Sequence, residues 1–457
     1  MRVAVCVRQG LDGEINPFDA CAYEQALRIE GAEVTLVSMG PSSVKDFLHD
    51  LTRRGAKEAI LLCDKAFAGS DTLATAYVLS LAMKKLCPDL VICGRQTLIG
   101  DTAQTGVMLS VLANMDSITN VMSVEFISDS HISCITRNEG SVEVRLPALI
   151  TVERINALRL PRLRSRLGDI QVWNAEDLGA DTSRCGLIGS PTRVVKTFEN
   201  SSGKRKCKFI SKDMLESVIE QAREKTVTSV GTTQQSVEKL SLVCIVGNEP
   251  RDYAMTVSDN VMKIDLSDAS TIAEEITRIK PDAVLWASDD KSKRTSAQVA
   301  AMLGLGLCAD CTRLECEGGQ LMMYRPALSG SVMAKIKSLT SPAMATVRTN
   351  SDEQADVIVG MGFGVRDEIE RVKDFAKNIG AQLCASRKLV DNGYVRYDMQ
   401  VGLTGKTVSP PVYIAIGVSG AVHHVVGMQR AGTVIAVNPD KGAPIFEYAD
   451  YGIVDNF

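Results

Sequence analysis

Residues 88–106 read Pro-Asp-Leu-Val-Ile-Cys-Gly-Arg-Gln-Thr-Leu-Ile-Gly-Asp-Thr-Ala-Gln-Thr-Gly. The apolar run from Leu90 to Cys93 is short and ends at a glycine, which predicts a buried strand. The segment from Gln104 to Asn114 then has a helical pattern. A buried strand followed by a helix is the unit from which parallel α/β sheets are built.

The same alternation runs through the first 115 residues. Strand-like runs at 3–7, 33–37 and 58–62 are each followed by a helical pattern, at 19–28, 43–54 and 71–85. Strands that alternate with helices predict a doubly wound parallel sheet covered on both faces. Ligands of such sheets bind at the carboxyl ends of the strands.

A second copy of this unit follows. Lys85-Leu-Cys-Pro-Asp-Leu-Val91 is echoed by Arg278-Ile-Lys-Pro-Asp-Ala-Val284, and Ala103-Gln104 by Ala297-Gln298. Pro147-Ala148 likewise recurs as Pro342-Ala343, so the separations stay between 193 and 195 residues. Matches in the same order at a nearly constant separation indicate a duplicated α/β unit.

The segment around 200–240 is polar and carries Gly and Ser, which is typical of a linker or surface arm, although residues 212–225 have a helical pattern. A third α/β unit begins after residue 350. We therefore expect a first domain with a C-terminal arm at 1–200, a linker at 201–240, a related domain at 241–348 and a C-terminal domain at 349–457.

Composition excludes several classes of protein. A net charge of −4 gives no electrostatic reason to expect nucleic-acid binding. The apolar runs are too short to span a bilayer, and the first residues enter a strand pattern directly, so we expect a cytoplasmic protein. The 13 cysteines are expected to be reduced. Cys308-Ala-Asp-Cys311 has the spacing of metal or redox ligands but lacks a second pair, so structural thiols are the preferred interpretation.

The first candidate site lies after the strand 90–93. The start of a helix exposes unpaired N–H groups that bind phosphate, and hydroxyl and amide side chains add donors. The alternative is an ordinary strand-to-helix turn capped by Asp101 or Thr102. The candidate residues here are Gly94, Gly100, Asp101, Thr102, Ala103, Gln104, Thr105 and Gly106.

Gly360-Met-Gly-Phe-Gly364 follows a strand pattern and resembles the start of a dinucleotide fingerprint. It lacks the final glycine of that motif. Close packing of the strand against the following helix is therefore the preferred interpretation over an NAD site.

The densest group of polar residues lies between Cys384 and Asp440, in loops that follow strand-like runs. Glycines there permit close approach of a ligand, and mixed donors suit phosphate, ribose and a heteroaromatic ring. Taken alone, His424 would be a buried core histidine and Arg387 a surface charge. Their concentration predicts a site for a nucleotide cofactor.

These loops carry a specific resemblance. Gln400-Val-Gly-Leu-Thr-Gly-Lys-Thr-Val-Ser-Pro410, Gly417-Val-Ser-Gly-Ala-Val-His-His424 and Asn438-Pro-Asp-Lys-Gly-Ala-Pro-Ile-Phe446 resemble the FAD-binding domain of electron transfer flavoprotein alpha subunits. The first half resembles a beta subunit through Cys6-Val-Arg-Gln9, Asn16-Pro-Phe-Asp19, Asp71-Thr-Leu-Ala-Thr75 and the run 93–106. The resemblance implies a beta-like and an alpha-like subunit joined in one chain, beta first.

The resemblance further implies that FAD is held by the last domain and exchanges electrons with partner proteins. Arg387 would lie against the isoalloxazine, Thr404 near N5 and His424 near the C2 carbonyl. Ser386, Ser419, Asn438 and Asp450 would hold the pyrophosphate, ribose or adenine. The complete set implied for FAD is Ser386, Arg387, Gln400, Thr404, Gly405, Lys406, Ser409, Gly417, Ser419, Gly420, His424, Asn438, Asp440 and Asp450.

The beta-like site is implied to bind AMP, or a second FAD that accepts hydride from NADH and bifurcates the electron pair. It would add Cys6, Asn16, Asp71 and Thr75 to the candidate residues after strand 90–93. Implied partners are a dehydrogenase, of the acyl-CoA type or another, and a quinone-linked or ferredoxin-type redox protein.

Phe363 stands where many alpha subunits have an arginine that contacts FAD, and the partner-docking segment 158–167 is short. A non-redox AMP-binding protein derived from this fold therefore stays open as an alternative function.

Overall fold

The computed structural model describes residues 1–10, 12–128, 130–137, 139–153, 156–161, 165, 167–199, 204–227, 238–328, 332–348, 355–402, 405–406, 408–429 and 431–457. The chain divides into two compact units. The first contains residues 1–197, 236–328 and 334–347, and the second contains 198–235, 329–333 and 348–457. Within the described ranges, no helix is both long and apolar enough to cross a membrane.

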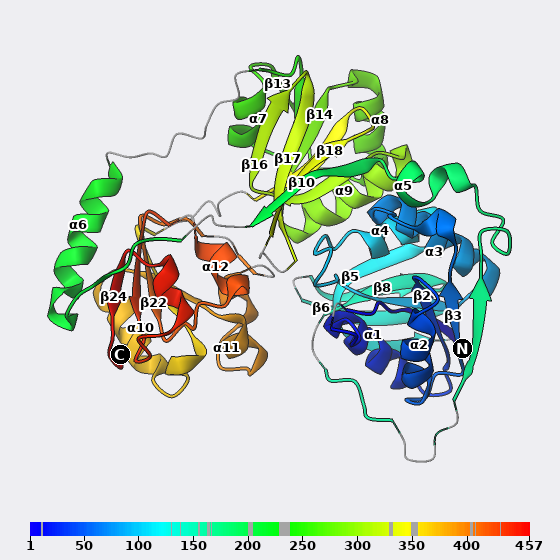
Figure 1. Cartoon of the computed structure of the whole chain (residues 1–457), viewed down its shortest axis with the longest axis horizontal. Coiled ribbons are helices and arrows are strands. Elements are labelled where there is room, and N and C mark those ends of the chain that lie inside the picture. Colours follow the sequence, from blue (N-terminus) through cyan, green and yellow to red (C-terminus); the bar gives the residue numbers. More distant parts are fainter. Residues whose placement is uncertain are drawn as a thin grey trace. The chain divides into compact units, whose positions relative to one another are not determined.

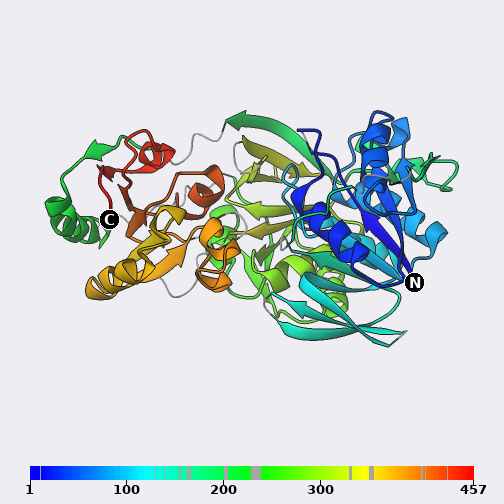
Figure 2. The same ribbon diagram turned by 90° about the horizontal axis from the view of Figure 1, so that it is seen from below.

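The first sheet of the first unit has the strand order β7-β6-β5-β8-β4-β1-β2-β3-β9. Its strands β1 to β4, β8 and β9 run parallel, and the hairpin β6–β7 extends one edge with antiparallel pairing (Figures 1 and 2). The bounds are β1 (Arg2–Cys6), β2 (Glu33–Met39), β3 (Glu58–Leu62), β4 (Leu90–Gly94), β5 (Asp116–Ser128), β6 (His131–Thr136), β7 (Gly140–Arg145), β8 (Ala148–Val152), β9 (Asp169–Trp173), α1 (Pro17–Leu27), α2 (Val44–Thr52), α3 (Thr72–Leu86), α4 (Thr105–Ala113) and α5 (Gly186–Gly189), with short 3-10 turns at Lys65–Phe67 and Thr182–Arg184.

The second sheet repeats the first. Its order β13-β12-β14-β19-β15 corresponds, strand for strand, to β2-β1-β4-β8-β5. Helices α3 and α8 also both end in a left-handed residue just before a proline, Cys87 and Lys280. The bounds are β12 (Val243–Val246), β13 (Val261–Ile264), β14 (Ala283–Ala287), β15 (Leu307–Cys311), β19 (Ala343–Val347), α7 (Arg251–Val257), α8 (Ala269–Ile279) and α9 (Asp290–Leu303). The predicted duplication and fold class are confirmed.

The first unit therefore has two halves, one built on each of these sheets. The halves are joined in two ways. Helices α4 and α9 pack against each other (Figure 1). Strand β10 (Thr192–Glu199), from the arm of the first half, joins β16 (Arg313–Glu317), β17 (Gln320–Ala327) and β18 (Val332–Ser338) of the second half in the order β10-β18-β17-β16. The halves therefore share a sheet as well as a helix contact.

The second unit is built on a parallel sheet of order β11-β24-β23-β22-β20-β21. Its central strands are buried along their whole length, which is why they read as continuous apolar runs. The bounds are β11 (Lys208–Phe209), β20 (Val357–Met361), β21 (Gln382–Ala385), β22 (Val412–Ile416), β23 (Thr433–Val437), β24 (Tyr451–Ile453), α6 (Leu215–Val227), α10 (Ile369–Asn378), α11 (Arg387–Asp391) and α12 (Val422–Met428), with 3-10 turns at Lys212–Met214, Phe363–Val365, Tyr397–Met399 and Pro444–Tyr448.

Part of the segment expected to be a linker belongs to this second unit. Strand β11 pairs with β24, and Leu215, Val218 and Ile219 of α6 pack in the same apolar cluster as β20 and β22. Arg205 secures the segment, because its guanidinium donates to the Asp450 carboxylate and to the carbonyls of residues 429, 431 and 432. Residues 228–237 of the expected linker lie outside the described ranges.

A buried polar chain crosses the core of the second unit. The Tyr413 hydroxyl contacts the His424 Nε2 at 2.9 Å and the Cys384 Sγ at 3.3 Å. Burial lowers the pKa of His424 to about 4, although the Val401 carbonyl favours the charged form. His424 is therefore a neutral core imidazole on a short helix.

Arg205→Ala should loosen the edge of the sheet in the second unit by about 2 kcal/mol, because a shielded charged hydrogen-bond network is lost. Amide hydrogen exchange of peptides from β23 and β24 measures this loss. Lys204→Ala is the control, since Lys204 pairs with Glu447 in solvent and should change exchange by less than about 0.5 kcal/mol. Fluorescence of Trp173 and Trp286, both in the first unit, should stay unchanged. Equal exchange in the two variants would contradict the role given to Arg205.

The second unit should lose stability as the pH falls from about 6.5 to about 4. Over this window the unfolded chain protonates His424 while the folded chain keeps it neutral, a difference of roughly 3 kcal/mol when complete. Hydrogen exchange of α12 as a function of pH measures the effect, and His424→Asn should flatten it. In an NMR titration of the four histidines, the signal absent from the variant should not titrate above pH 5. An ordinary titration of that signal would contradict this prediction.

Candidate functional site

A cavity of about 990 Å³ lies at the carboxyl ends of β1 to β4 in the first unit. Its volume is at the upper end of the roughly 300–1,000 Å³ typical of ligand pockets. The second half and the arm supply the opposite wall, through Thr192, Val194, Leu307, Cys308, Arg325, Ala327, Ala334 and Ile336. The residues predicted for the beta-like site that line it are Cys6, Asp71, Thr75, Gly94, Gly100, Thr102, Ala103, Gln104, Thr105 and Gly106.

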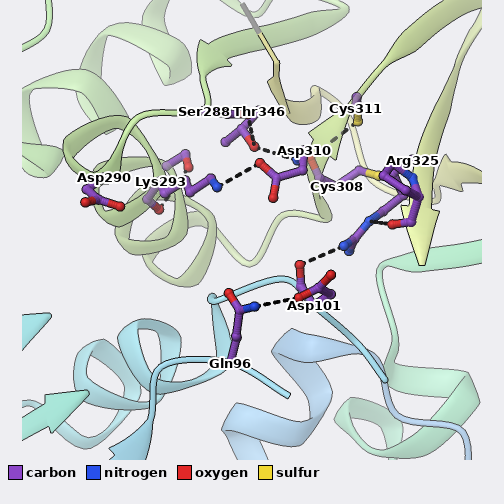
Figure 3. A network of polar contacts seen from close by, with 12 residues as sticks. Gln96, Asp101, Ser288, Asp290, Lys293, Cys308, Asp310, Cys311, Arg325 and Thr346 are labelled. Atoms are coloured by element: carbon purple, nitrogen blue, oxygen red, sulfur yellow. Dashed lines mark hydrogen bonds and ion pairs between the residues drawn. The ribbon is translucent and has the colours of Figure 1, made fainter. Parts of the chain in front are cut away.

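The loop before α4 has an unusual backbone. Asp101 and Ala103 are both left-handed, with φ of 55° and 54°. Figure 3 shows what holds Asp101: the Gln96 Nε2 donates to its carboxylate at 2.6 Å and the Arg325 Nη2 donates to its carbonyl at 2.8 Å. Asp101 therefore supports the loop and does not line the cavity.

Helix α4 begins without a side-chain cap, and its N-cap residue is Gln104. The alternative of a turn capped by Asp101 or Thr102 is therefore wrong. The Gln104 Oε1 accepts a hydrogen bond from the Thr72 hydroxyl at 3.3 Å, whereas its buried Nε2 has no hydrogen-bond partner among the described residues. An unpartnered buried donor beside an uncapped helix start suits an anionic or nucleotide ligand.

Two predicted residues have structural roles here. The buried Asn16 donates to the carbonyl of Gln96 at 2.9 Å and accepts from the N–H of Leu98, which fixes the loop after β4. Asp71 caps α3 and also accepts two bonds from Thr192, so it ties the arm to the first half while it lines the cavity. Both side chains therefore hold parts of the cavity wall in place.

Asp19 is an ionisable group that lines this cavity and that sequence reasoning did not assign to the site. Its carboxylate accepts a hydrogen bond from the N–H of Arg8 at 2.8 Å. Burial raises its pKa to about 7, and hydrogen bonds from Asn16 and Arg8 oppose the shift. Gly94 must be a glycine, because a Cβ there would collide with Asp19. The run 16–19 is part of the beta-subunit resemblance, but its spacing alone does not predict that the Asp19 carboxylate lies in the cavity.

The second unit brings the other predicted residues to the carboxyl edge of its sheet. Ser386 follows β21, the Gly417–Gly420 loop follows β22, and Asn438 follows β23. The Asn438 Nδ2 donates to the Val418 carbonyl at 3.0 Å, and its Oδ1 accepts from the N–H of Asp440. Gly420 has φ of 90°, and a Cβ there would collide with Ile445. Strand order therefore gathers residues that are far apart in sequence.

Ser386 is the most informative residue of this edge. It is the N-cap of α11 and makes no capping bond. Its hydroxyl is buried and has no partner within the described part of the chain. The adjacent Arg387 is three-quarters buried and its Nε donates to Asp391 at 3.1 Å.

The remaining predicted residues differ in position. Gln400 is buried and bridges to Ala385, and Lys406 pairs with Val401, so both belong to the loop beside β21. Asp450 binds Arg205 and the N–H of Val434, which is a structural role. Gly405 packs on the Gln400 backbone. Of the other predicted residues, Ser409 and Ser419 lie within the described ranges, and Thr404 lies outside them.

The glycines at 360–364 serve packing. A Cβ at Gly360 would collide with Tyr413, and one at Gly362 would collide with the carbonyl of Gly417. Gly364 lies within the 3-10 turn Phe363–Val365, and α10 begins only at Ile369, so no α-helix opens at the glycines as an NAD fingerprint requires. Phe363 packs edge-on against Tyr394, and the Lys388 ammonium lies 4.2 Å from its ring centroid.

Comparison with known proteins gives two family matches. The electron transfer flavoprotein domain matches residues 3–178 and 210–372, and the electron transfer flavoprotein FAD-binding domain matches residues 353–429. Protein FixA of Azorhizobium caulinodans is 40% identical over 223 residues, covering 45% of this chain and 79% of FixA.

Both subunit types of electron transfer flavoproteins are similar to this chain. The beta subunit of Thermoanaerobacterium thermosaccharolyticum is 39% identical over 202 residues, covering 42% of this chain and 78% of the subunit. The alpha subunit of the same organism is 37% identical over 232 residues, covering 41% of this chain and 70% of the subunit. The chain therefore belongs to the electron transfer flavoprotein family and joins beta-like and alpha-like regions in one polypeptide.

Proposed function

We propose that this chain carries electrons through an FAD bound at the carboxyl edge of the second unit, and that the cavity of the first unit binds AMP or a second FAD. The observation that carries the first part is the buried, unpartnered Ser386 hydroxyl at an uncapped helix start. The same edge of the sheet carries the Gly417–Gly420 loop, in which the Val418 carbonyl accepts a hydrogen bond from Asn438. These groups fit a nucleotide cofactor, and the matched domain is described as FAD-binding.

Each group has a defined task in this proposal. The Ser386 hydroxyl and the main-chain N–H groups of the Gly417–Gly420 loop would donate to phosphate oxygens. Bound FAD would supply one- and two-electron chemistry that side chains cannot. Arg387 would favour negative charge on the reduced cofactor, because a shielded guanidinium is weakly screened.

The cavity of the first unit fits an adenine nucleotide. The Gln104 Nε2 and the start of α4 offer donors to phosphate, and the volume admits either a mononucleotide or a larger cofactor. If a second FAD binds here, NADH is the proposed electron donor and the electron pair would bifurcate. The proposed partners are a dehydrogenase and a quinone-linked or ferredoxin-type protein.

Protein reconstituted with FAD should be yellow and should contain one FAD per chain with AMP, or two without it. Arg387→Ala should lower the midpoint potential by roughly 30 mV, about 1.4 kcal/mol for a two-electron couple. Lys388→Ala is the matched control, because its ammonium lies over Phe363 and its loss should shift the potential less. A colourless protein that binds AMP alone would contradict the electron-carrier proposal and favour the non-redox alternative.

Gln104→Leu should weaken AMP binding about tenfold in calorimetry, which corresponds to one lost hydrogen bond of about 1.4 kcal/mol. Gln298→Leu is the control, since Gln298 occupies the repeated position in the second half and does not line the cavity. Equal affinities in the two variants would remove Gln104 from the proposed site.

A further inference from the structure

Strand β15 contains a bulge that decides where its two cysteines point. Cys308 pairs with Ala345 and Cys311 pairs with Val347, so an interval of three residues on β15 faces an interval of two on β19. Asp310, inside the bulge, is left-handed with φ of 56°. Side chains alternate between the faces of a regular strand, and one extra residue reverses that alternation. Cys308 and Cys311 therefore lie on the same face.

Packing agrees with this assignment. Both cysteines belong to one apolar cluster, whereas Leu307 packs in the cluster on the other face. The Cys311 Sγ contacts the carbonyl oxygen of Cys308 at 3.6 Å. The two thiols are thus neighbours (Figure 3).

The bulge is held from two sides. The Thr346 hydroxyl accepts a hydrogen bond from the N–H of Asp310 at 2.9 Å, and the Lys293 ammonium meets the Asp310 carboxylate at 2.8 Å (Figure 3). All three side chains are largely buried. This framework keeps the two thiols together without a disulfide bond between them.

The two thiols differ in environment. Cys308 lines the large cavity, and Cys311 does not. A side-chain hydrogen bond from the Cys311 thiol lowers the pKa of Cys308, burial opposes this shift, and the nearby Arg325 guanidinium adds to it. Burial and the same bond raise the pKa of Cys311. The thiol that a reagent can reach is therefore also the better nucleophile.

A metal does not explain the pair. Among the residues that the structure describes, no group of three or more Cys, His, Asp or Glu side chains could hold a metal ion. Tetrahedral zinc needs four ligands or three with an open position.

We infer that Cys308 and Cys311 form a redox-responsive dithiol in the wall of the cavity, with Cys308 as the attacking thiol and a small disulfide as its oxidant. The Cys308 sulfur attacks one sulfur of the disulfide, whose S–S bond breaks, and the first small thiol leaves with the Cys308 proton. Cys311 then loses its proton and attacks the Cys308 sulfur, which expels the second small thiol. Two protein thiols are oxidised by two electrons, and one disulfide is reduced to two thiols.

The test treats the reduced whole chain with 2,2′-dithiodipyridine and follows each cysteine by tryptic mass spectrometry. Cys308 and Cys311 share the peptide 295–313, and Cys244 lies alone in 240–251. Cys244 is a matched control, because it is equally buried in a parallel strand of the same unit and does not line the cavity. We expect peptide 295–313 to lose two hydrogens at least tenfold faster than Cys244 is labelled.

Two variants separate the roles of the thiols. Cys311→Ser should stop the reaction at a mixed disulfide on Cys308, and Cys308→Ser should leave Cys311 unlabelled. Fluorescence of Trp173 and Trp286 checks that each variant is folded. Reaction of Cys308 in the unaltered chain no faster than that of Cys244 overturns the inference, as does a Cys311→Ser protein that carries no mixed disulfide.

Discussion

The hydrogen bond from Arg325 to the carbonyl of Asp101 is the contact on which the cavity of the first unit depends. Both residues are buried, and they come from different halves of the unit. Asp101 and Ala103 hold left-handed backbone that is unfavourable for residues other than glycine, so the loop needs outside support. The guanidinium supplies that support and closes one wall. The start of α4 therefore has its shape only where the two halves meet.

The two copies of the duplicated unit differ at the start of one helix, and this difference accounts for the candidate site in the first half. In the second half, Asp289 caps α9 by accepting a hydrogen bond from the N–H of Ser292 at 2.9 Å. In the first half, α4 begins at Gln104 without such a bond. The same strand order thus ends in a satisfied helix start in one copy and an unsatisfied one in the other. The repeated sheet of the second half contributes walls and support.

The features that could be predicted from the sequence are those that local sequence patterns determine. The buried strands, the duplicated unit and the loop before α4 follow from apolar runs and glycine-rich turns, whereas Cys6, Asp71 and Thr75 were expected from the family resemblance alone. The wall formed by Cys308 and Arg325 could not be located by spacing, because these residues lie about two hundred positions away. Asp450 was expected at a ligand, but its carboxylate holds Arg205 and the edge of the sheet. The structural role of such a residue is not visible in the sequence when its partner is distant along the chain.

The two candidate sites share a chemical character. Gln104 and Ser386 offer neutral donors, and burial keeps His424 neutral as well. Neutral donors bind phosphate and ring atoms without strongly favouring one charge state of the ligand, whereas a shielded cation does favour the more negative state. Arg387, at the start of α11, is such a cation, although Asp391 offsets part of its charge. If FAD binds here as proposed, one partly offset cation among neutral donors would limit how strongly the reduced state is held.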